Sequence, residues 1–264
     1  MKEFSSANSD LSRRFGGIDR LYGPGALTRL AASRVCVIGI GGVGSWAAEA
    51  LARSGVGNLV LIDLDHVAES NINRQIHALD ATLGQSKVQA MAERIAAINP
   101  ACRVECTEEF ISPENVTELL PACDGVVDAI DQVRAKAALI AHCRAIGAPV
   151  VTTGGAGGRT DPARIRLDDL SRTTQDALAS KVRARLRKEH GFPRDPKKKF
   201  GVACVYSDQP IQRPRGGAAC DVDGVPHALR PQGLNCAGYG SSVMVTATFG
   251  FAAAARVVAG ILEL

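Results

Sequence analysis

Short hydrophobic runs alternate, along the first half of the chain, with stretches in which hydrophobic residues recur every three or four positions. The short runs are typical of buried strands and the longer stretches of amphipathic helices. Strands are predicted at residues 34–39, 58–63, 102–106, 125–129 and 149–153, and helices at 43–54, 86–99 and 133–146. The alternation predicts an α/β fold with a doubly wound, mostly parallel, Rossmann-like sheet covered by helices.

The second half of the chain has a less regular pattern. It predicts a strand at residues 164–167 and a helix over 174–189. From about residue 191 to 235 the sequence is rich in glycine, proline and charge, and it shows little hydrophobic periodicity. We interpret this stretch as irregular, because so long a segment without regular elements is usually functional or mobile.

The C-terminal region is the most hydrophobic part of the chain. Residues 237–255 carry no charge, and Arg256 interrupts an apolar stretch that runs on to Leu262. Nineteen uncharged residues reach the lower limit for a membrane span. The run consists mostly of Ala, Gly, Ser and Thr, which drive insertion weakly. We therefore expect a buried core helix, with membrane association through residues 237–262 as the alternative.

Composition and charge narrow the class of protein. The chain has 264 residues, of which 46% are hydrophobic and 22% charged, and this composition excludes a disordered, collagen-like or coiled-coil protein. The net charge of +4 is unevenly spread, since residues 181–199 hold nine Lys or Arg and only two acidic residues. This basic segment is either a solvated face or a contact surface for nucleic-acid phosphates.

The cysteines indicate a reducing compartment. Eight are scattered along the chain, and the first fourteen residues are polar, without the apolar core of a secretory signal. We therefore expect a cytoplasmic protein without a disulfide framework. Because no Cys-x-x-Cys pair occurs, no zinc site is expected. The five histidines have no metal-binding spacing, and His77, the nearest to the motifs described next, is interpreted as structural.

A glycine-rich turn follows the first predicted strand. Gly39, Gly41, Gly42 and Gly44 form a GxGxxG pattern between that strand and a helix, and Asp63 ends the next strand nineteen residues after Gly44. Such glycines let the backbone approach a phosphate at a helix N-terminus, and the carboxylate can bind a ribose hydroxyl. The motif predicts an adenine nucleotide, and taken alone it favours NAD.

More polar residues near the strand ends argue against NAD. They are Asn71, Arg74, Lys87, Asp128 and Asp131. Two cations, an amide and carboxylates exceed what the pyrophosphate of a dinucleotide requires. They suit a triphosphate with Mg²⁺, because cations neutralise phosphates and an aspartate can hold the metal.

The ordered motifs of residues 14–153 resemble those of a known superfamily. The sequences GxGGVGS, LIDxDxVxxSNxNRQ, GQxK and DAxDxxxxK occur in the order found in the ubiquitin-activating-like adenylating enzymes, which include the adenylyltransferases of molybdopterin and thiamine biosynthesis. RRFGGIDRLYG, NRQIHAL, VTTGGAGGRTDP and LNCAGYGSSVMVTATFGF resemble one branch of it over nearly the whole chain. That branch comprises the tRNA threonylcarbamoyladenosine dehydratases.

The resemblance implies a fold, a reaction and a set of residue roles. It implies one adenylating domain over 1–264, with the nucleotide-binding core at 34–153 and an irregular basic segment and apolar helix over 154–264. The implied reaction is the ATP-dependent cyclisation of threonylcarbamoyladenosine next to the tRNA anticodon, through adenylation of its carboxylate. The implied roles are ATP binding by Gly39, Gly41, Gly42, Gly44 and Asp63, phosphate contact by Asn71, Arg74 and Lys87, and Mg²⁺ binding by Asp131.

Other features of the family are less directly matched. The sulfur-carrier adenylyltransferases have an N-terminal RYNRQ whose second arginine reaches the partner's site, and here only Arg14 or Arg20 is near that register. The resemblance implies a homodimer, and it leaves open a monovalent cation and a sulfur-transfer partner protein. Cys236 is either a nucleophile or a small buried residue.

Two other functions remain open from the sequence. One is an adenylyltransferase that activates the C-terminal glycine of a ubiquitin-like sulfur carrier, against which the basic segment and the absent cysteine pairs weigh. The other is an NAD-dependent oxidoreductase, which accounts for the first sixty-three residues and leaves the polar residues from Asn71 to Asp131 unexplained.

Overall fold

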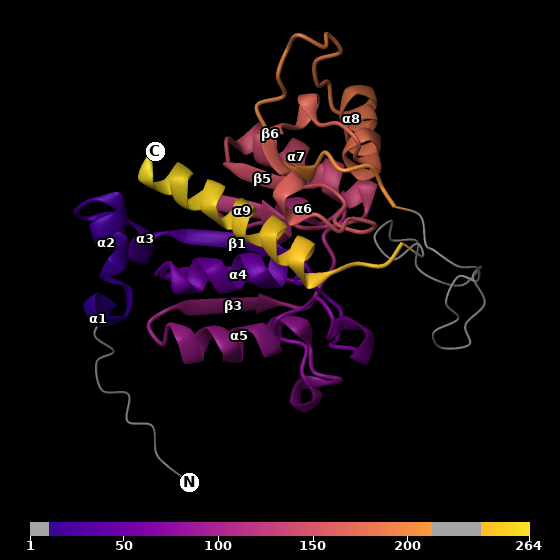
Figure 1. The fold of residues 1–264 in the computed structure, drawn as a ribbon. Helices are drawn as coiled ribbons and strands as arrows, with labels where there is room; N and C mark the ends of the chain where they lie inside the picture. Colours follow the sequence, from indigo (N-terminus) through magenta and orange to yellow (C-terminus); the bar gives the residue numbers. More distant parts are fainter. Residues whose placement is uncertain (1–10, 213–238) are drawn as a thin grey trace.

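A single mixed sheet organises the chain in the computed structural model, which describes residues 11–212 and 239–264 (Figure 1). Its strand order over the described residues is β3-β2-β1-β4-β5-β7-β6, with only β6 antiparallel to its neighbour. The strands are β1 (Arg34–Ile38), β2 (Asn58–Ile62), β3 (Arg103–Thr107), β4 (Gly125–Asp128), β5 (Val150–Thr153), β6 (Ile165–Asp169) and β7 (Ala203–Ser207). The predicted doubly wound, mostly parallel fold is therefore confirmed.

Helices cover both faces of this sheet. They are α1 (Leu11–Phe15), α2 (Gly17–Tyr22), α3 (Ala26–Ala32), α4 (Gly44–Arg53), α5 (Lys87–Ile98), α6 (Val116–Leu119), α7 (Val133–Ile146), α8 (Ala177–Glu189) and α9 (Val243–Leu262). Alternate strand residues point to opposite faces. Val35 and Val37 of β1 join a core with α4, α5 and α9, whereas Cys36 and Ile38 join one with α6 and α7. Burial on both faces explains the unbroken hydrophobic runs of the strands.

The C-terminal helix α9 crosses one face of the sheet and packs along α4 (Figure 1). It is the one helix of the described residues that is long and apolar enough to cross a membrane. Of its most hydrophobic 18-residue stretch, 56% is buried inside the protein. Phe249, Ala253 and Val257 belong to the main core. Helix α9 is thus the buried core helix that the sequence predicts.

Three parts of the fold differ from the sequence-based expectation. The N-terminal helices α1 to α3 and the short helix α6 were not predicted, and β7 lies inside the stretch from 191 to 235 that was interpreted as irregular. Strand β7 is only five residues long, but four of them are buried between β5 and β6. A run this short, surrounded by glycine and charge, becomes recognisable as a strand only through its neighbours in the sheet.

The strand order places the functional motifs at one edge. The chain runs outward from β1 to β2 and β3, and then returns to the other side of β1 with β4 and β5. The loops after β1 and β4 therefore separate at the carboxyl ends of the strands, and such a crevice is where α/β sheets bind ligands. The glycine-rich turn, Asp63 and Asp131 all follow strands that end at this edge.

Helix α9 can approach α4 closely because residue 250 is glycine, and this contact yields a stability prediction. A Cβ at Gly250 would lie 2.5 Å from the Val43 carbonyl oxygen and 2.8 Å from the Ala47 nitrogen. Gly250→Ala should therefore destabilise the protein by about 1–3 kcal/mol in urea unfolding, as overpacking usually does.

The matched control is Gly260→Ala on the same helix. A Cβ there would come no closer than 3.6 Å, to the end of the Arg256 side chain. This variant should gain up to about 1 kcal/mol from helix propensity. Equal effects of the two substitutions would contradict the close packing of α9 on α4.

Candidate active site

The glycine-rich turn forms a narrow loop between β1 and the N-terminus of α4. A Cβ at Gly44 would lie 1.8 Å from the Gly39 carbonyl oxygen, so this crossing of the backbone requires glycine. At Gly41, by contrast, a Cβ would meet nothing within 4 Å. Packing therefore does not require glycine at 41, and the absent side chain leaves open space beside the first amides of α4. This is the geometry of a phosphate cradle.

Asp63 anchors the glycine loop from the end of β2. Its Oδ2 accepts a hydrogen bond of 2.6 Å from the Ile40 N–H, and its Oδ1 accepts one of 2.9 Å from the Asp65 N–H. The side chain is buried, and burial raises the pKa of its carboxyl group, against the opposing charge of Lys87. Sequence reasoning assigned Asp63 to a ribose and missed this second role in holding the loop.

Lys87 begins α5 at the same edge. Its Nζ lies 2.6 Å from Asp65 Oδ2, and its side chain is buried whereas that of Asp65 is about half exposed. An antiparallel bridge between His66 and Ser86 holds these two residues opposite each other. Asp65 therefore balances the charge of Lys87 at the carboxyl edge of the sheet.

The segment that contains Asn71 and Arg74 lies against the glycine loop. A Cβ at Gly42 would be 3.2 Å from Arg74 Cγ, and the Arg74 carbonyl accepts a 2.9 Å hydrogen bond from Trp46 Nε1. The Arg74 guanidinium donates to the Ser70 carbonyl at 2.6 Å. Asn71 is buried, and its side chain accepts from the Ala68 N–H at 3.1 Å, so it shapes this turn.

The two aspartates after β4 have different environments. Asp128 is fully buried and forms an ion pair of 2.8 Å with Lys136, which is also buried. Asp131 is only partly buried, and the structure gives its carboxylate no hydrogen bond or ion pair with the described part of the chain. Asp131 is therefore available to a ligand, whereas Asp128 is a structural group. The resemblance implied Mg²⁺ binding by Asp131 alone, and sequence reasoning gave no structural role to Asp128.

The side chains at this edge of the sheet fit a Mg²⁺ ion only if a nucleotide supplies most of its ligands. Among the described residues no group of three or more His, Cys, Asp or Glu side chains is placed to hold a metal ion. Mg²⁺ bound with a nucleotide usually takes one or two carboxylates and obtains its other oxygen ligands from phosphates and water. A single accessible carboxylate such as Asp131 fits that mode.

The other predicted site residues lie away from the crevice or outside the described residues. Arg14 donates to the Ile98 carbonyl at the C-terminal end of α5, which is the opposite edge of the sheet, and Arg20 lies on α2 near it. Cys236 falls outside the described residues. His77 is buried near Lys87 and Arg94, and burial together with these charges lowers its pKa to about 4.

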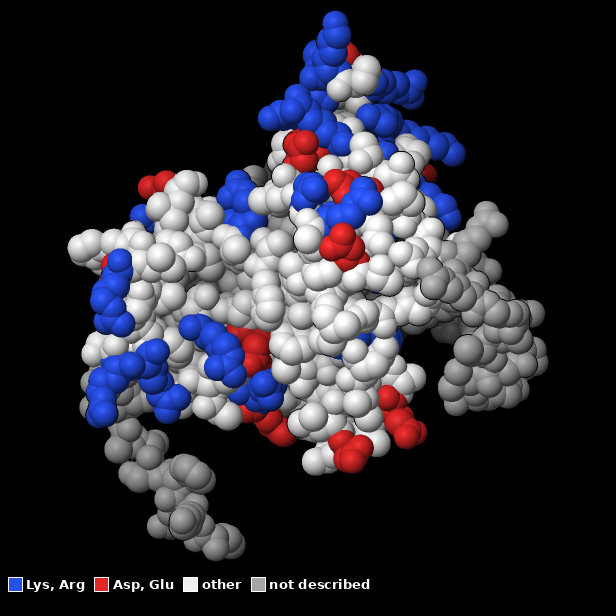
Figure 2. Space-filling view, in the orientation of Figure 1, with Lys and Arg blue, Asp and Glu red and all other residues white. Residues whose placement is uncertain are grey.

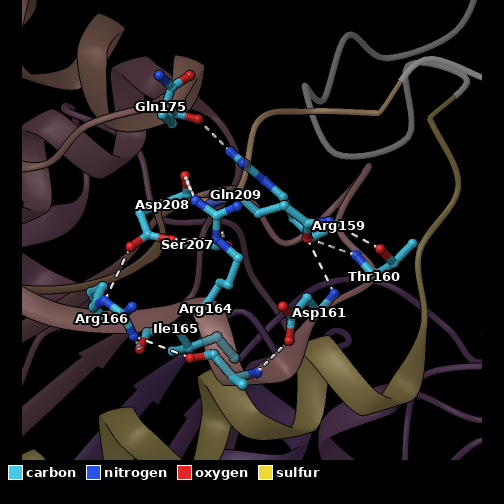
Figure 3. A network of polar contacts seen from close by, with 11 residues as sticks. Arg159, Thr160, Asp161, Arg164, Ile165, Arg166, Gln175, Ser207, Asp208 and Gln209 are labelled. Carbon is cyan, nitrogen blue, oxygen red and sulfur yellow. Dashed lines mark hydrogen bonds and ion pairs between the residues drawn. The ribbon is translucent and has the colours of Figure 1, made fainter.

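A second polar network follows β5 (Figure 3). Arg159 is buried and donates to the Gln175 carbonyl, and Asp208 pairs with Arg164 and Arg166 at 2.7 and 3.1 Å. These contacts join the loop after β5 to β6 and to the start of α8. They fix the loops on the side of the sheet that holds β5, β7 and β6, away from the glycine loop.

The predicted basic segment is an ordered projection from the body of the protein. Lys and Arg side chains gather there, over α8 and the loop after it (Figure 2). Phe192 and Phe200 anchor the loop in the core with their ring centroids 5.0 Å apart. An open pocket of about 500 Å³ beside them is lined by Ala184, Arg187, Lys188, Arg194 and Pro196.

Comparisons with known proteins agree with this geometry. The model of the ThiF family matches residues 14–263. The tRNA threonylcarbamoyladenosine dehydratase of Haemophilus influenzae is 49% identical over 253 residues, which are 95% of this chain and 94% of that protein. The crystal structure of the Escherichia coli tRNA N6-threonylcarbamoyladenosine dehydratase in complex with ATP has 46% identity and a TM-score of 0.86, with 97% of both chains covered. The AMP complex of that enzyme also has 46% identity and a TM-score of 0.86, with 98% coverage of each.

The contacts of Asp63 lead to a prediction about nucleotide affinity. In Asp63→Asn the amide group can accept on one side only, so either the Ile40 or the Asp65 N–H loses its partner. We expect a loss of about 1–3 kcal/mol in stability. We also expect weaker ATP binding, measured through the fluorescence of Trp46, the only tryptophan.

Asp124→Asn provides the control. Asp124 accepts a single backbone N–H, that of Arg34, at the opposite edge of the sheet, and an asparagine oxygen can replace it there. ATP affinity should stay unchanged in this variant. If both variants bound ATP as the parent does, Asp63 would have no part in shaping the nucleotide loop.

Proposed function

The chain belongs to the ThiF family across residues 14–263, and on this basis we propose that it dehydrates threonylcarbamoyladenosine next to the tRNA anticodon in an ATP-dependent reaction. One observation carries the proposal. Relatives of this activity, including one solved with ATP, match nearly the whole length of both chains at close to half identity. The similarity extends well beyond the nucleotide-binding core.

The reaction requires activation because a carboxylate is a poor electrophile. A carboxylate oxygen of the substrate attacks the α-phosphorus of ATP, and pyrophosphate leaves with its charge neutralised by cations. The carbamoyl group of the same side chain then attacks the activated carbonyl carbon. AMP leaves as the carbon–oxygen bond breaks, and the ring closes. The net change is loss of one water from the nucleoside, with ATP converted to AMP and pyrophosphate.

The described residues supply binding and charge for these steps. The amides from Gly41 to Gly44 donate to phosphate oxygens, and Asp63 accepts from a ribose hydroxyl while it holds the loop through the Ile40 N–H. Arg74 and Lys87 stabilise charge on the departing pyrophosphate. To do this, Lys87 must exchange part of its contact with Asp65 for a phosphate.

Asp131 is our candidate for the metal contact. The turn that carries it lies against the glycine loop, since the Ala129 carbonyl oxygen is 3.0 Å from where a Gly39 Cβ would be. Bound Mg²⁺ would supply Lewis-acid stabilisation of phosphate charge. The monovalent cation stays a prediction from the sequence, as do the sulfur-transfer partner and the nucleophilic role of Cys236.

The basic segment is the proposed contact for the tRNA backbone. Its cations surround an open pocket on an ordered projection, and phosphate oxygens are the ligands that such a surface suits. Aromatic side chains do not provide a stacking platform here, because Phe192 and Phe200 are buried. We therefore expect recognition of a folded tRNA by its phosphates rather than of extended single strands.

A homodimer in the cytoplasm completes the proposal. Arg14 lies at the edge of the sheet opposite its own glycine loop, and Arg20 is on the neighbouring helix. Either can therefore act on a nucleotide only across an interface with a second copy. Modification of tRNA and the six free cysteines of the described residues agree with a reducing compartment.

The alternative, activation of a sulfur-carrier protein, is not favoured by the relatives. The first test is mass spectrometry of nucleosides from tRNA that carries threonylcarbamoyladenosine, after incubation with the protein and ATP–Mg²⁺. We expect ATP-dependent loss of one water from that nucleoside. No loss, under conditions in which a known dehydratase converts the same tRNA, would contradict the proposed function.

The site assignment gives a sharper prediction. Lys87→Ala and Asp131→Ala should each abolish ATP–pyrophosphate exchange, because each removes charge stabilisation from the pyrophosphate-forming step. Arg103→Ala, at an exposed position on β3, is the control and should exchange normally. Full exchange in either site variant would remove that residue from the proposed machinery.

The basic segment leads to a prediction about tRNA binding. A variant with Lys188, Arg194 and Lys198 replaced by serine should raise the KM for tRNA at least about tenfold and flatten its salt dependence, since each lost phosphate contact reduces the slope by about one. The KM for ATP should not change. Replacing Arg53 and Arg103 by serine is the control, and an equal effect there would contradict a localised tRNA surface.

A further inference from the structure

Lys136 and Asp128 form a buried ion pair at the carboxyl edge of the sheet. Lys136 is 1% exposed and Asp128 is 0% exposed. Lys136 lies in the first turn of α7, and Asp128 is the last residue of β4, immediately before the turn that carries Asp131. The pair therefore joins a helix to the strand end beside the proposed nucleotide site.

Three oxygen atoms inside the protein surround the Lys136 ammonium group. Its Nζ donates to the Asp128 carbonyl at 3.1 Å and to Thr152 Oγ1 at 3.0 Å, and it forms the ion pair with Asp128 Oδ2 at 2.8 Å. The side chain is 1% exposed, so the group is closed off from solvent. Lys136 is therefore not a catalytic residue.

Stability alone does not explain such a pair. Burying two opposite charges has a desolvation cost that their attraction often fails to recover, and hydrophobic replacements are frequently as stable. Glu49 is another buried carboxylate with ion pairs, to Arg53 on its own helix and to Arg94 between α4 and α5. It differs because neither arginine is buried and because it contacts no loop at the carboxyl edge.

The contacts of Asp128 show what the pair does to the neighbouring turn. Its Oδ2 forms the ion pair with Lys136 and accepts a 2.6 Å hydrogen bond from the Thr152 hydroxyl. Its Oδ1 accepts the Ile130 N–H at 3.2 Å. The Ala129 N–H donates to the Ile38 carbonyl at 2.9 Å. The turn from 129 to 131 is thus bonded to β1 and to the Asp128 carboxylate, whose orientation Lys136 and Thr152 of β5 fix.

From these contacts we propose that Lys136 is a positioning residue, which fixes the turn after β4 so that the Asp131 carboxylate stands at the nucleotide crevice. The proposal rests on the proposed function for the identity of the nucleotide. It assigns Lys136 an effect on the Asp131 site that is separable from its effect on stability.

The experiment separates these two effects with a neutral replacement of the pair. Lys136→Met alone leaves a buried carboxylate unpaired and should strongly lower the Tm. The double variant Asp128→Asn/Lys136→Met removes both charges and should recover most of that loss. An asparagine oxygen can still accept from Ile130, and its amide group can donate to the Thr152 hydroxyl, but both hydrogen bonds of Lys136, to the Asp128 carbonyl and to Thr152, are lost.

Two readouts follow the position of Asp131. The first is the dissociation constant of ATP with and without Mg²⁺, from Trp46 fluorescence. The second is kcat for ATP–pyrophosphate exchange. In the double variant we expect the gain in ATP affinity on adding Mg²⁺ to disappear, as in Asp131→Ala. We also expect a 10- to 100-fold loss in kcat, the scale caused by displacements of about 1 Å. ATP affinity without Mg²⁺ should stay within about threefold of the parent.

Two further variants keep the test decisive. Glu49→Gln/Arg94→Met neutralises the other pair and should leave both readouts unchanged. Thr152→Val removes one contact of Lys136 with little change of shape, so it should fold and show a smaller effect in the same direction. The proposal would be overturned if the double variant had the kcat of the parent and the same gain in ATP affinity on adding Mg²⁺. If the double variant does not fold, the same result in Thr152→Val would overturn it. A parent that binds ATP–Mg²⁺ without dehydrating the nucleoside would instead overturn the proposed function.

Discussion

Two buried carboxylates hold the loops on which the site depends. Asp63 follows β2 and Asp128 ends β4, the strands on either side of β1. Asp63 accepts the N–H groups of Ile40 and Asp65, and Asp128 accepts that of Ile130. Parallel strands end in backbone groups that need partners, and a carboxylate can accept several of them at once. The two groups proposed to face the ligand are Lys87, which pairs with Asp65, and Asp131, which lies in the turn after β4. Both are therefore carried by segments whose positions Asp63 and Asp128 fix.

Charge is divided over the molecule in a way that suits the proposed reaction. Near the glycine loop each cation has defined contacts, since Lys87 pairs with Asp65 and Arg74 donates to the Ser70 carbonyl and to Asn73 Oδ1. On α8 and the loop after it, cations are numerous and open to solvent (Figure 2). The first arrangement suits the defined phosphates of one nucleotide, and the second suits the many phosphates of a folded RNA. The two surfaces belong to different parts of one sheet, the first beside β1 and the second beside β7.

The sequence was sufficient for the parts of the fold that follow local patterns. Strands β1 to β5 and helices α4, α5, α7 and α9 are recognisable because their hydrophobic runs are buried on a defined face. The ordered motifs also predicted the family, which the comparisons confirm. Strand β7 and the roles of Asp63 and Lys136 were not recoverable, since they arise from contacts between residues far apart in the chain. For instance, Ile40 meets Asp63 and Thr152 meets Lys136 only after the strands pair.

Activation of a carboxylate by adenylation is the central claim, and an isotope experiment tests it most directly. The experiment uses tRNA whose threonylcarbamoyladenosine carries ¹⁸O at both carboxylate oxygens, incubated with the protein and ATP–Mg²⁺. The masses of the nucleotide products are measured by mass spectrometry. If the carboxylate attacks the α-phosphorus, one ¹⁸O leaves with AMP when the ring closes. Unlabelled AMP, or label found in inorganic phosphate together with ADP, would contradict adenylation.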